Sequence, residues 1–105
     1  MTDPIVEMIK SGAKIIDVRS PEEFDDEHYT NAINIPVNLI QARLSELGDK
    51  ESPLVLYCAT GSRSAYAARI LAMSGYKKVI NAGGLYDMPS EDQLDGIPLP
   101  GAQAM

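Results

Sequence analysis

The chain has 105 residues, of which 45% are hydrophobic and 23% charged, and its formal net charge at pH 7 is −6. A chain of this length forms one domain around a single layered core, and its composition is ordinary for a globular protein. The acidic balance argues against a nucleic-acid partner, because such a surface needs clustered Lys and Arg.

The cysteine content and the hydropathy pattern limit the class of protein further. Cys58 is the one cysteine, so no intramolecular disulfide can form. No apolar run approaches the ~20 residues that a membrane helix requires, and residues 1–4 do not resemble a signal peptide. We therefore expect a cytoplasmic protein without a membrane partner, or a periplasmic one if a signal peptide has been removed.

The first two predicted elements are a helix and a strand. Asp3 and Pro4 are typical of a helix start, with Asp3 as the N-cap and Pro4 at the first helical position, and Gly12 is typical of the end. The apolar run that follows predicts a strand over residues 14–18. The opening helix is expected to serve packing only.

Two charged residues, Asp17 and Arg19, stand at the carboxyl end of this strand. They either border a ligand crevice, or they have a structural role in which they form ion pairs or bind loop backbone groups. The structural role is the simpler interpretation. The next four residues, 20–23, read Ser-Pro-Glu-Glu. This is a capping box with proline at the first helical position, and it predicts a short helix to about residue 27. Pairing of Arg19 with an acid of that helix is left open.

His28 is the one histidine and raises the question of a cysteine–histidine dyad. It follows an acidic helix and precedes a turn, a position suited to fixing loop backbone by hydrogen bonds. The structural role is favoured over a catalytic one. One His and one Cys are too few ligands for a metal site, so none is predicted.

The middle of the chain predicts a short strand and a further helix. Residues 32–35 form the strand, which Pro36 stops. Asn38 is expected to cap a helix whose apolar positions form one core-facing stripe, namely Leu39, Ile40, Leu44 and Leu47.

The most informative stretch is residues 54–64. Four apolar residues lead into Cys58, small and polar residues follow, and a helical pattern begins at Ser64. A short apolar run bounded by turn residues is typical of a buried strand in a parallel sheet. The following helix is expected to bury Tyr66, Ala67, Ile70 and Leu71 and to stop at Gly75.

The last predicted strand covers residues 77–81, and Gly83 and Gly84 after it are expected to lie near the loop at Cys58. Residues 89–105 contain three prolines and little periodicity, which predicts a partly ordered tail. Strands that alternate with helices predict an α/β fold, with a mostly parallel sheet covered on both faces. Four strands are visible in the pattern.

Cys58 is the candidate nucleophile. A strand, a tight loop and a helix start direct backbone N–H groups toward one spot, at the sheet edge where α/β proteins bind ligands. Such a setting, with Arg63 nearby, lowers the pKa of a thiol by roughly one to several units. The alternative is an inert buried cysteine, but an ordinary turn needs neither an arginine nor so many small donors.

The loop from Cys58 to Ser64, Cys-Ala-Thr-Gly-Ser-Arg-Ser, resembles the active-site loop of a single-domain rhodanese, a sulfurtransferase. Three more stretches agree with that family in the same order, and together the matches span about residues 13–88; they are residues 15–24, 27–36 and 79–84. Residues 81–88 most resemble the small phage-shock-type rhodaneses. Asn31 stands where the family usually has glycine, and the tryptophan often found after the glycine pair is absent.

The resemblance implies a three-layer fold with a five-stranded sheet, formed by residues 1–105 as one domain. It implies that Cys58 accepts sulfane sulfur as a persulfide from thiosulfate or a persulfide donor, and passes it to cyanide or to a thiol, including a protein thiol such as that of a thioredoxin-like protein. Arg63 is expected to clamp the donor anion, and no cofactor is required. The expected substrate-binding residues are Ala59, Thr60, Gly61, Ser62, Arg63 and Ser64, and those surrounding the loop are Asp17, Arg19, His28, Gly83 and Gly84.

Two rival functions stay open. Cysteine phosphatases and arsenate reductases also hold a thiolate in an anion-binding loop, but they place five residues between Cys and Arg. Here Cys58 and Arg63 enclose four, and the shorter ring suits a single sulfur better. The second rival is a sulfur-carrier or persulfide-binding module that works only with a protein partner and has no meaningful turnover.

Overall fold

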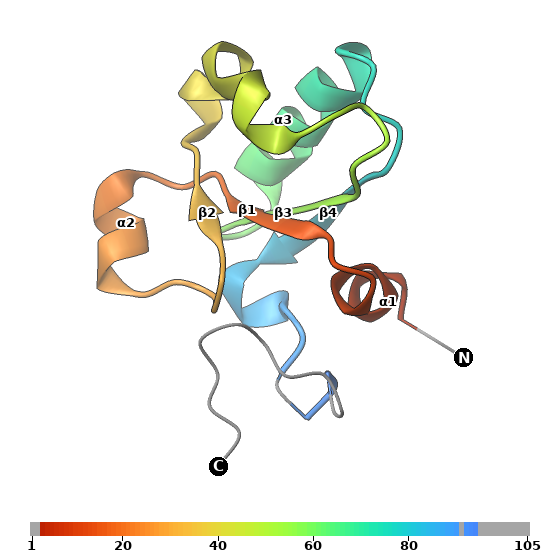
Figure 1. Ribbon diagram of the computed structural model, residues 1–105. Coiled ribbons are helices and arrows are strands. Elements are labelled where there is room, and N and C mark those ends of the chain that lie inside the picture. Colours follow the sequence, from red (N-terminus) through yellow and green to blue (C-terminus); the bar gives the residue numbers. More distant parts are fainter. Residues whose placement is uncertain (1–2, 91, 95–105) are drawn as a thin grey trace.

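A parallel sheet of four strands forms the centre of the molecule (Figure 1). The computed structural model describes residues 3–90 and 92–94. The strands are β1 (Lys14–Asp17), β2 (Ile33–Asn34), β3 (Leu54–Cys58) and β4 (Val79–Gly84), in the order β2-β1-β3-β4. Each neighbouring pair runs parallel, so the carboxyl ends of all four strands meet at one edge of the sheet.

The described residues form four strands rather than the five that the resemblance implied. The segment before β1 forms helix α1 (Pro4–Lys10) instead, because Asp3 Oδ1 accepts a hydrogen bond from the Ile5 amide at 2.8 Å and starts the helix there. This helix start was predicted correctly. Residues 1–2, 91 and 95–105, where the rest of the predicted tail falls, lie outside the described part of the chain.

Two further helices flank the sheet, α2 (Pro21–Asp26) and α3 (Ser62–Met73). The predicted capping box of α2 is confirmed: Ser20 Oγ accepts from the Glu23 amide, and Glu23 Oε1 accepts from the Ser20 amide at 2.9 Å. The inward face of α3 was only partly predicted. Tyr66 is 62% exposed, and Ser64 occupies a buried position beside Ala67 and Leu71.

The predicted helix over residues 38–47 was wrong. This segment forms two 3₁₀ helices, η1 (Val37–Leu39) and η2 (Gln41–Leu47), and Arg43 has a non-helical φ of −116° inside the second. Pro36 rather than Asn38 precedes the first turn. Ile40 and Leu47 are nevertheless fully buried, so most of the apolar stripe still reaches the core.

The core has two parts, one on each face of the sheet, and β3 supplies both because alternate side chains point to opposite faces. Leu54, Leu56 and Cys58 face α3, η1 and η2, whereas Val55 and Tyr57 face α1 and η3 (Leu85–Asp87). Figure 1 shows these helices on either side of the sheet. Leu94, in the segment predicted as a tail, is buried in the second part.

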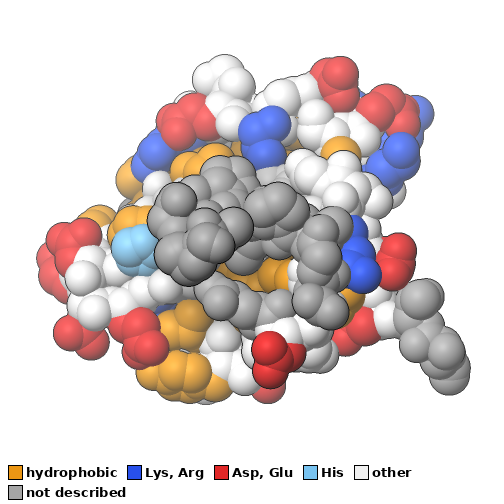
Figure 2. Space-filling model, turned by 60° about the horizontal axis from the view of Figure 1, so that its bottom comes forward, with side chains coloured by type: hydrophobic (Ala, Val, Ile, Leu, Met, Phe, Trp, Pro, Cys, Tyr) orange, Lys and Arg blue, Asp and Glu red, His pale blue; other side chains and the backbone are white. Residues whose placement is uncertain are grey.

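None of the helices that the described residues form has the length and apolar character needed to cross a bilayer. On the face that Figure 2 turns toward the reader, Lys and Arg side chains are interspersed with acidic ones around the rim. Charge of both signs is therefore spread over this face rather than gathered into one basic surface.

Candidate active site

Cys58 is the last residue of β3, at the edge of the sheet where the four strands end. Its side chain is fully buried and packs on the α3 side of the sheet. A loop of three residues leads from it to Ser62, the first residue of α3, and Gly61 stands at the N-cap of that helix with a φ of 106°. This left-handed conformation favours glycine, and it turns the loop back over the sulfur.

Three groups of the loop and helix start lie within hydrogen-bond distance of Cys58 Sγ. The Gly61 amide donates at 3.0 Å, and the Ser64 amide and hydroxyl both lie at 3.4 Å. Burial raises the pKa of the Cys58 thiol, but the hydrogen bonds from Ser64, Gly61 and the Thr60 amide outweigh it and lower the pKa below its ordinary value. The sulfur is buried among apolar residues, yet its environment favours the thiolate.

The glycine pair of β4 lies directly against this loop, where Gly84 pairs with Cys58 in the sheet. A Cβ atom built on Gly84 would lie 2.3 Å from the Ala59 carbonyl oxygen, and one built on Gly61 would lie 3.3 Å from Gly83 Cα. The strand is longer than the predicted 77–81, since it includes both glycines. Only residues without a side chain allow the two backbones this separation.

Asn81 connects β4 to the loop, a role that was not predicted from the sequence. Its Nδ2 donates to the Gly61 carbonyl at 3.1 Å, and its Oδ1 accepts from the Ser64 hydroxyl at 2.6 Å and from the Gly83 amide at 2.9 Å. The one available signal was its position, a polar residue at the carboxyl end of a predicted strand.

Arg63, in the first turn of α3, forms a bidentate ion pair with Glu23 of α2. Arg63 Nη1 lies 2.7 Å from Glu23 Oε1, and Nη2 lies 3.0 Å from Oε2. The hydrogen bond to Glu23 also raises the pKa of Arg63 above its ordinary value. From the sequence, Glu23 was predicted only as part of the capping box, so its ion pair with Arg63 was missed.

The other predicted binding residues, Ala59, Thr60 and Ser62, have exposed side chains around the loop. Ser64, which was expected beside them, is instead fully buried. The loop therefore has an exposed rim and a buried floor, and the sulfur belongs to the floor.

Asp17 and Arg19 are buried and paired with each other, with 2.7 Å between Arg19 Nη2 and Asp17 Oδ2. Arg19 also donates to the Glu27 carbonyl, and the Tyr57 hydroxyl donates to Asp17 at 2.7 Å. The hydrogen bond to Asp17 raises the pKa of Arg19, and burial raises that of Tyr57. Arg19 thus binds a backbone carbonyl after α2 rather than an acid of that helix.

His28 is exposed and its contacts are with α2. Its ring stacks on Phe24 at a centroid distance of 3.7 Å, and Nδ1 lies 2.7 Å from the Phe24 carbonyl oxygen. These contacts fit a role in holding the backbone at the end of α2. Nowhere in the described ranges do three or more His, Cys, Asp or Glu side chains gather as metal ligands would.

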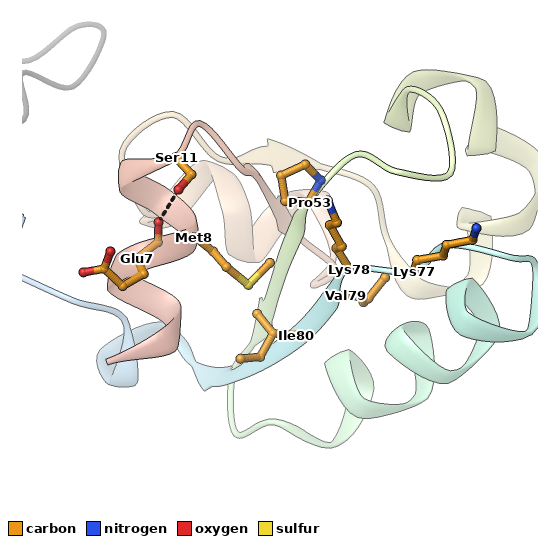
Figure 3. Close-up of a pocket in the computed structure, with 8 residues that line it drawn as sticks. All are labelled: Glu7, Met8, Ser11, Pro53, Lys77, Lys78, Val79 and Ile80. Atoms are coloured by element: carbon orange, nitrogen blue, oxygen red, sulfur yellow. Dashed lines mark hydrogen bonds between the residues drawn. The ribbon is translucent and has the colours of Figure 1, made fainter. Parts of the chain in front are cut away.

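Two of the cavities that described residues line lie at opposite ends of the sheet. One of about 360 Å³ borders Arg63 at the carboxyl ends of β1 and β2, with Val18, Pro36 and Leu39 among its apolar walls. The other, of about 520 Å³, lies between α1 and the start of β4, where Met8 and Ile80 face each other (Figure 3). Since Cys58 stands at the carboxyl end of β3, only the first adjoins the candidate site.

Comparisons with known proteins show which proteins this chain resembles. The model of the rhodanese-like domain family matches residues 2–88. The thiosulfate sulfurtransferase PspE of Escherichia coli is 43% identical over 74 residues, which cover 70% of this chain and 71% of that protein. A putative sulfur carrier protein of Bacillus subtilis, YrkF, is 37% identical over 64% of this chain, and the match spans 36% of its own length.

Among solved structures, a rhodanese from E. coli with bound anions superposes with a TM-score of 0.70 at 42% identity. The superposition covers 74% of this chain and 95% of that one. The fold and the sequence therefore lead to the same group of proteins.

Proposed function

This chain belongs to the rhodanese-like family, and from that premise we propose that it is a thiosulfate sulfurtransferase that carries sulfane sulfur as a persulfide on Cys58. The observation that carries the proposal is the set of donors around Cys58 Sγ at the start of α3, which favours the thiolate. The thiolate is the nucleophilic form of cysteine.

In the first half-reaction, the Cys58 thiolate attacks the outer sulfur of thiosulfate. The bond between the two thiosulfate sulfurs breaks, its electron pair leaves with sulfite, and Cys58 carries a persulfide anion. The amides of the loop, preorganised at the helix start, stabilise negative charge on sulfur throughout. Arg63 binds the oxyanion part of the donor, since a guanidinium matches two oxygens at once.

In the second half-reaction, cyanide or a thiolate attacks the terminal sulfur of the persulfide. Thiocyanate or a new persulfide leaves, and the Cys58 thiolate is regenerated. Ala59, Thr60 and Ser62 form the rim that the acceptor meets, and the cavity beside Arg63 offers it space. The chain's own sulfur carries the group, so the reaction needs no cofactor.

Asp17, Arg19 and His28 have a supporting role in this proposal, and Gly83 and Gly84 make room for the loop. The buried Asp17–Arg19 pair and the Tyr57 hydroxyl join β1, β3 and the chain after α2 behind the site. In the proposed reaction none of these groups transfers a proton.

A sulfur carrier that serves only a protein partner is the second candidate. It is supported by the likeness to the B. subtilis protein and by the burial of Cys58, because a donor has to displace part of the loop to reach the sulfur. A partner protein that displaces the exposed rim at Ala59 and Thr60 would expose the sulfur.

Thiosulfate:cyanide turnover of the wild type, Cys58→Ser and Arg63→Ala tests the proposal. We expect complete loss for Cys58→Ser and a raised KM for thiosulfate in Arg63→Ala. Mass spectrometry after thiosulfate treatment should find one added sulfur on the wild type and none on Cys58→Ser. Faster turnover of an aryl phosphate than of thiosulfate would favour a phosphatase, and persulfide formation without turnover would favour the carrier.

A further inference from the structure

We propose that Glu23 is a positioning residue for sulfur transfer, whose carboxylate holds the Arg63 guanidinium so that its unused N–H groups face the donor oxyanion. The inference rests on the proposed function, in which Arg63 binds the donor. It concerns a residue of α2 that lies 40 positions before Arg63 in the chain.

The ion pair occupies one end of the guanidinium and leaves the rest available. An arginine carries five N–H donors, and the contacts to Glu23 use one on Nη1 and one on Nη2. Within residues 3–90 and 92–94, no other hydrogen bond from Arg63 is formed, so Nε and the second hydrogen of each terminal nitrogen can meet an anion. That anion then binds to a different edge of the same planar group.

Glu23 is itself held firmly, which allows it to orient a long side chain. Oε1, which contacts Arg63, also accepts from the Ser20 amide at 2.9 Å, and the Ser20 hydroxyl accepts from the Glu23 amide. The hydrogen bond from Arg63, followed by that from the Ser20 amide, lowers the pKa of Glu23 to about 2. The carboxylate is therefore ionised throughout the range in which the enzyme would work.

The advantage of this arrangement is lower entropy loss on binding. Ordering a free arginine side chain costs conformational entropy. If the ion pair orders Arg63 before the donor arrives, that cost no longer weakens donor binding. The two side chains are 38% and 35% exposed, and pairs this exposed contribute little to stability, so a purely structural role accounts poorly for the bidentate geometry beside the loop.

The test is a double-mutant cycle with Glu23→Gln, Arg63→Ala and both together. Glutamine also serves at this capping-box position, so Glu23→Gln preserves the start of α2 and removes the charge. We expect the KM for thiosulfate to rise about fivefold to tenfold in Glu23→Gln, the scale of one ordinary net hydrogen bond, with kcat within about twofold of the wild type. In the Arg63→Ala background the same change should have no further effect.

Glu22→Gln is the matched control, because it removes the same charge from the adjacent, exposed residue of α2. We expect it to leave KM unchanged. A second readout is independent of turnover: calorimetric binding of thiosulfate to Cys58→Ser should weaken when Glu23→Gln is added and not when Glu22→Gln is added.

Two results would overturn the proposal. One is a KM and a thiosulfate affinity that Glu23→Gln leaves unchanged; the other is an effect that is equally large with and without Arg63, as a loss of structure would give. A failure of the proposed function would give a different result from these two. In that case the wild type itself would neither turn over thiosulfate nor gain a sulfur at Cys58.

Discussion

The Ser64 hydroxyl has one proton and four acceptors within reach. The Asn81 Oδ1 lies at 2.6 Å, the Gly61 carbonyl at 3.2 Å, and the Gly83 carbonyl and Cys58 Sγ at 3.4 Å. While the sulfur is a neutral thiol, the shortest contact takes the proton. A thiolate is the stronger acceptor because hydrogen bonds to charged groups are about twice as strong, so ionisation of Cys58 recruits the Ser64 proton toward sulfur.

Ser64→Ala should therefore raise the pKa of Cys58. The lost hydrogen bond stabilises the charged form of the sulfur, while the Gly61 and Ser64 amides keep part of that stabilisation. The thiolate absorbs in the ultraviolet, so titration of that absorbance gives the pKa without a reagent that must reach a buried sulfur.

The pH profile should move in the same direction. Because the thiol is the inactive form, kcat/KM for thiosulfate falls as pH drops through the pKa of Cys58, and in Ser64→Ala this fall should occur at higher pH. Ser62→Ala is the control, since that exposed hydroxyl lies outside the network. Equal pKa values in the two variants would contradict a direct effect of Ser64 on the sulfur.

At the scale of elements, the site depends on how closely β4 approaches the loop after β3. Gly84 has an extended backbone that any residue can adopt, with φ of −96°. Glycine is required there only because a side chain would clash. The Ala59 carbonyl oxygen would lie 2.3 Å from an added Cβ. Since both groups belong to backbone, neither can move without shifting the loop that surrounds Cys58.

Gly84→Ala should therefore reduce kcat/KM by more than tenfold, the scale of loss expected when a preorganised donor set is misplaced. Gly12→Ala is the control, because no atom lies within 4 Å of its added Cβ. Its φ of 94° makes alanine unfavourable by about 1 kcal/mol, so it should lower stability and leave kcat/KM unchanged. Comparable kinetic losses in both variants would mean that stability, not loop geometry, controls activity.

The elements differ in how far the sequence predicts them, and local chemistry explains the difference. The start of α2 was predictable because the capping box is complete within residues 20–23. Residues 37–47 carry the same apolar spacing as a helix, yet the spacing of 3₁₀ and α helices is too similar to separate them by pattern alone. Cys58 and its loop were found through adjacent residues, whereas Glu23 and Asn81 reach the site only through tertiary contacts 40 and 20 positions away.

For the whole molecule, the carboxyl edge of the sheet is held together by a buried polar network. Asp17 accepts hydrogen bonds from Arg19 and from the Tyr57 hydroxyl, which in turn accepts from the Tyr29 amide. Asn34 of β2 donates to the carbonyls of Asp17 and Arg19 at 3.0 Å. Three strands and the chain after α2 thus meet in one set of bonds behind Cys58. The sequence left the roles of Asp17 and Arg19 open because Tyr57 and Asn34 meet them only in the folded sheet.

Asp17→Asn should destabilise the fold by roughly 3–5 kcal/mol, because it leaves the Arg19 charge buried without its counter-charge. The control is Glu46→Gln, which breaks the exposed Arg43–Glu46 pair and should have little effect on stability, because solvent screens such a pair. Urea unfolding at one pH measures both. Each pair joins one guanidinium to one carboxylate at 2.6–2.7 Å, so the difference comes from the burial of Asp17 and from the hydrogen bond that it also accepts from Tyr57. If the two variants unfold at the same urea concentration, the polar network does not hold the carboxyl edge together. The loop between Cys58 and Ser62 must then be held in place by β4 and Asn81.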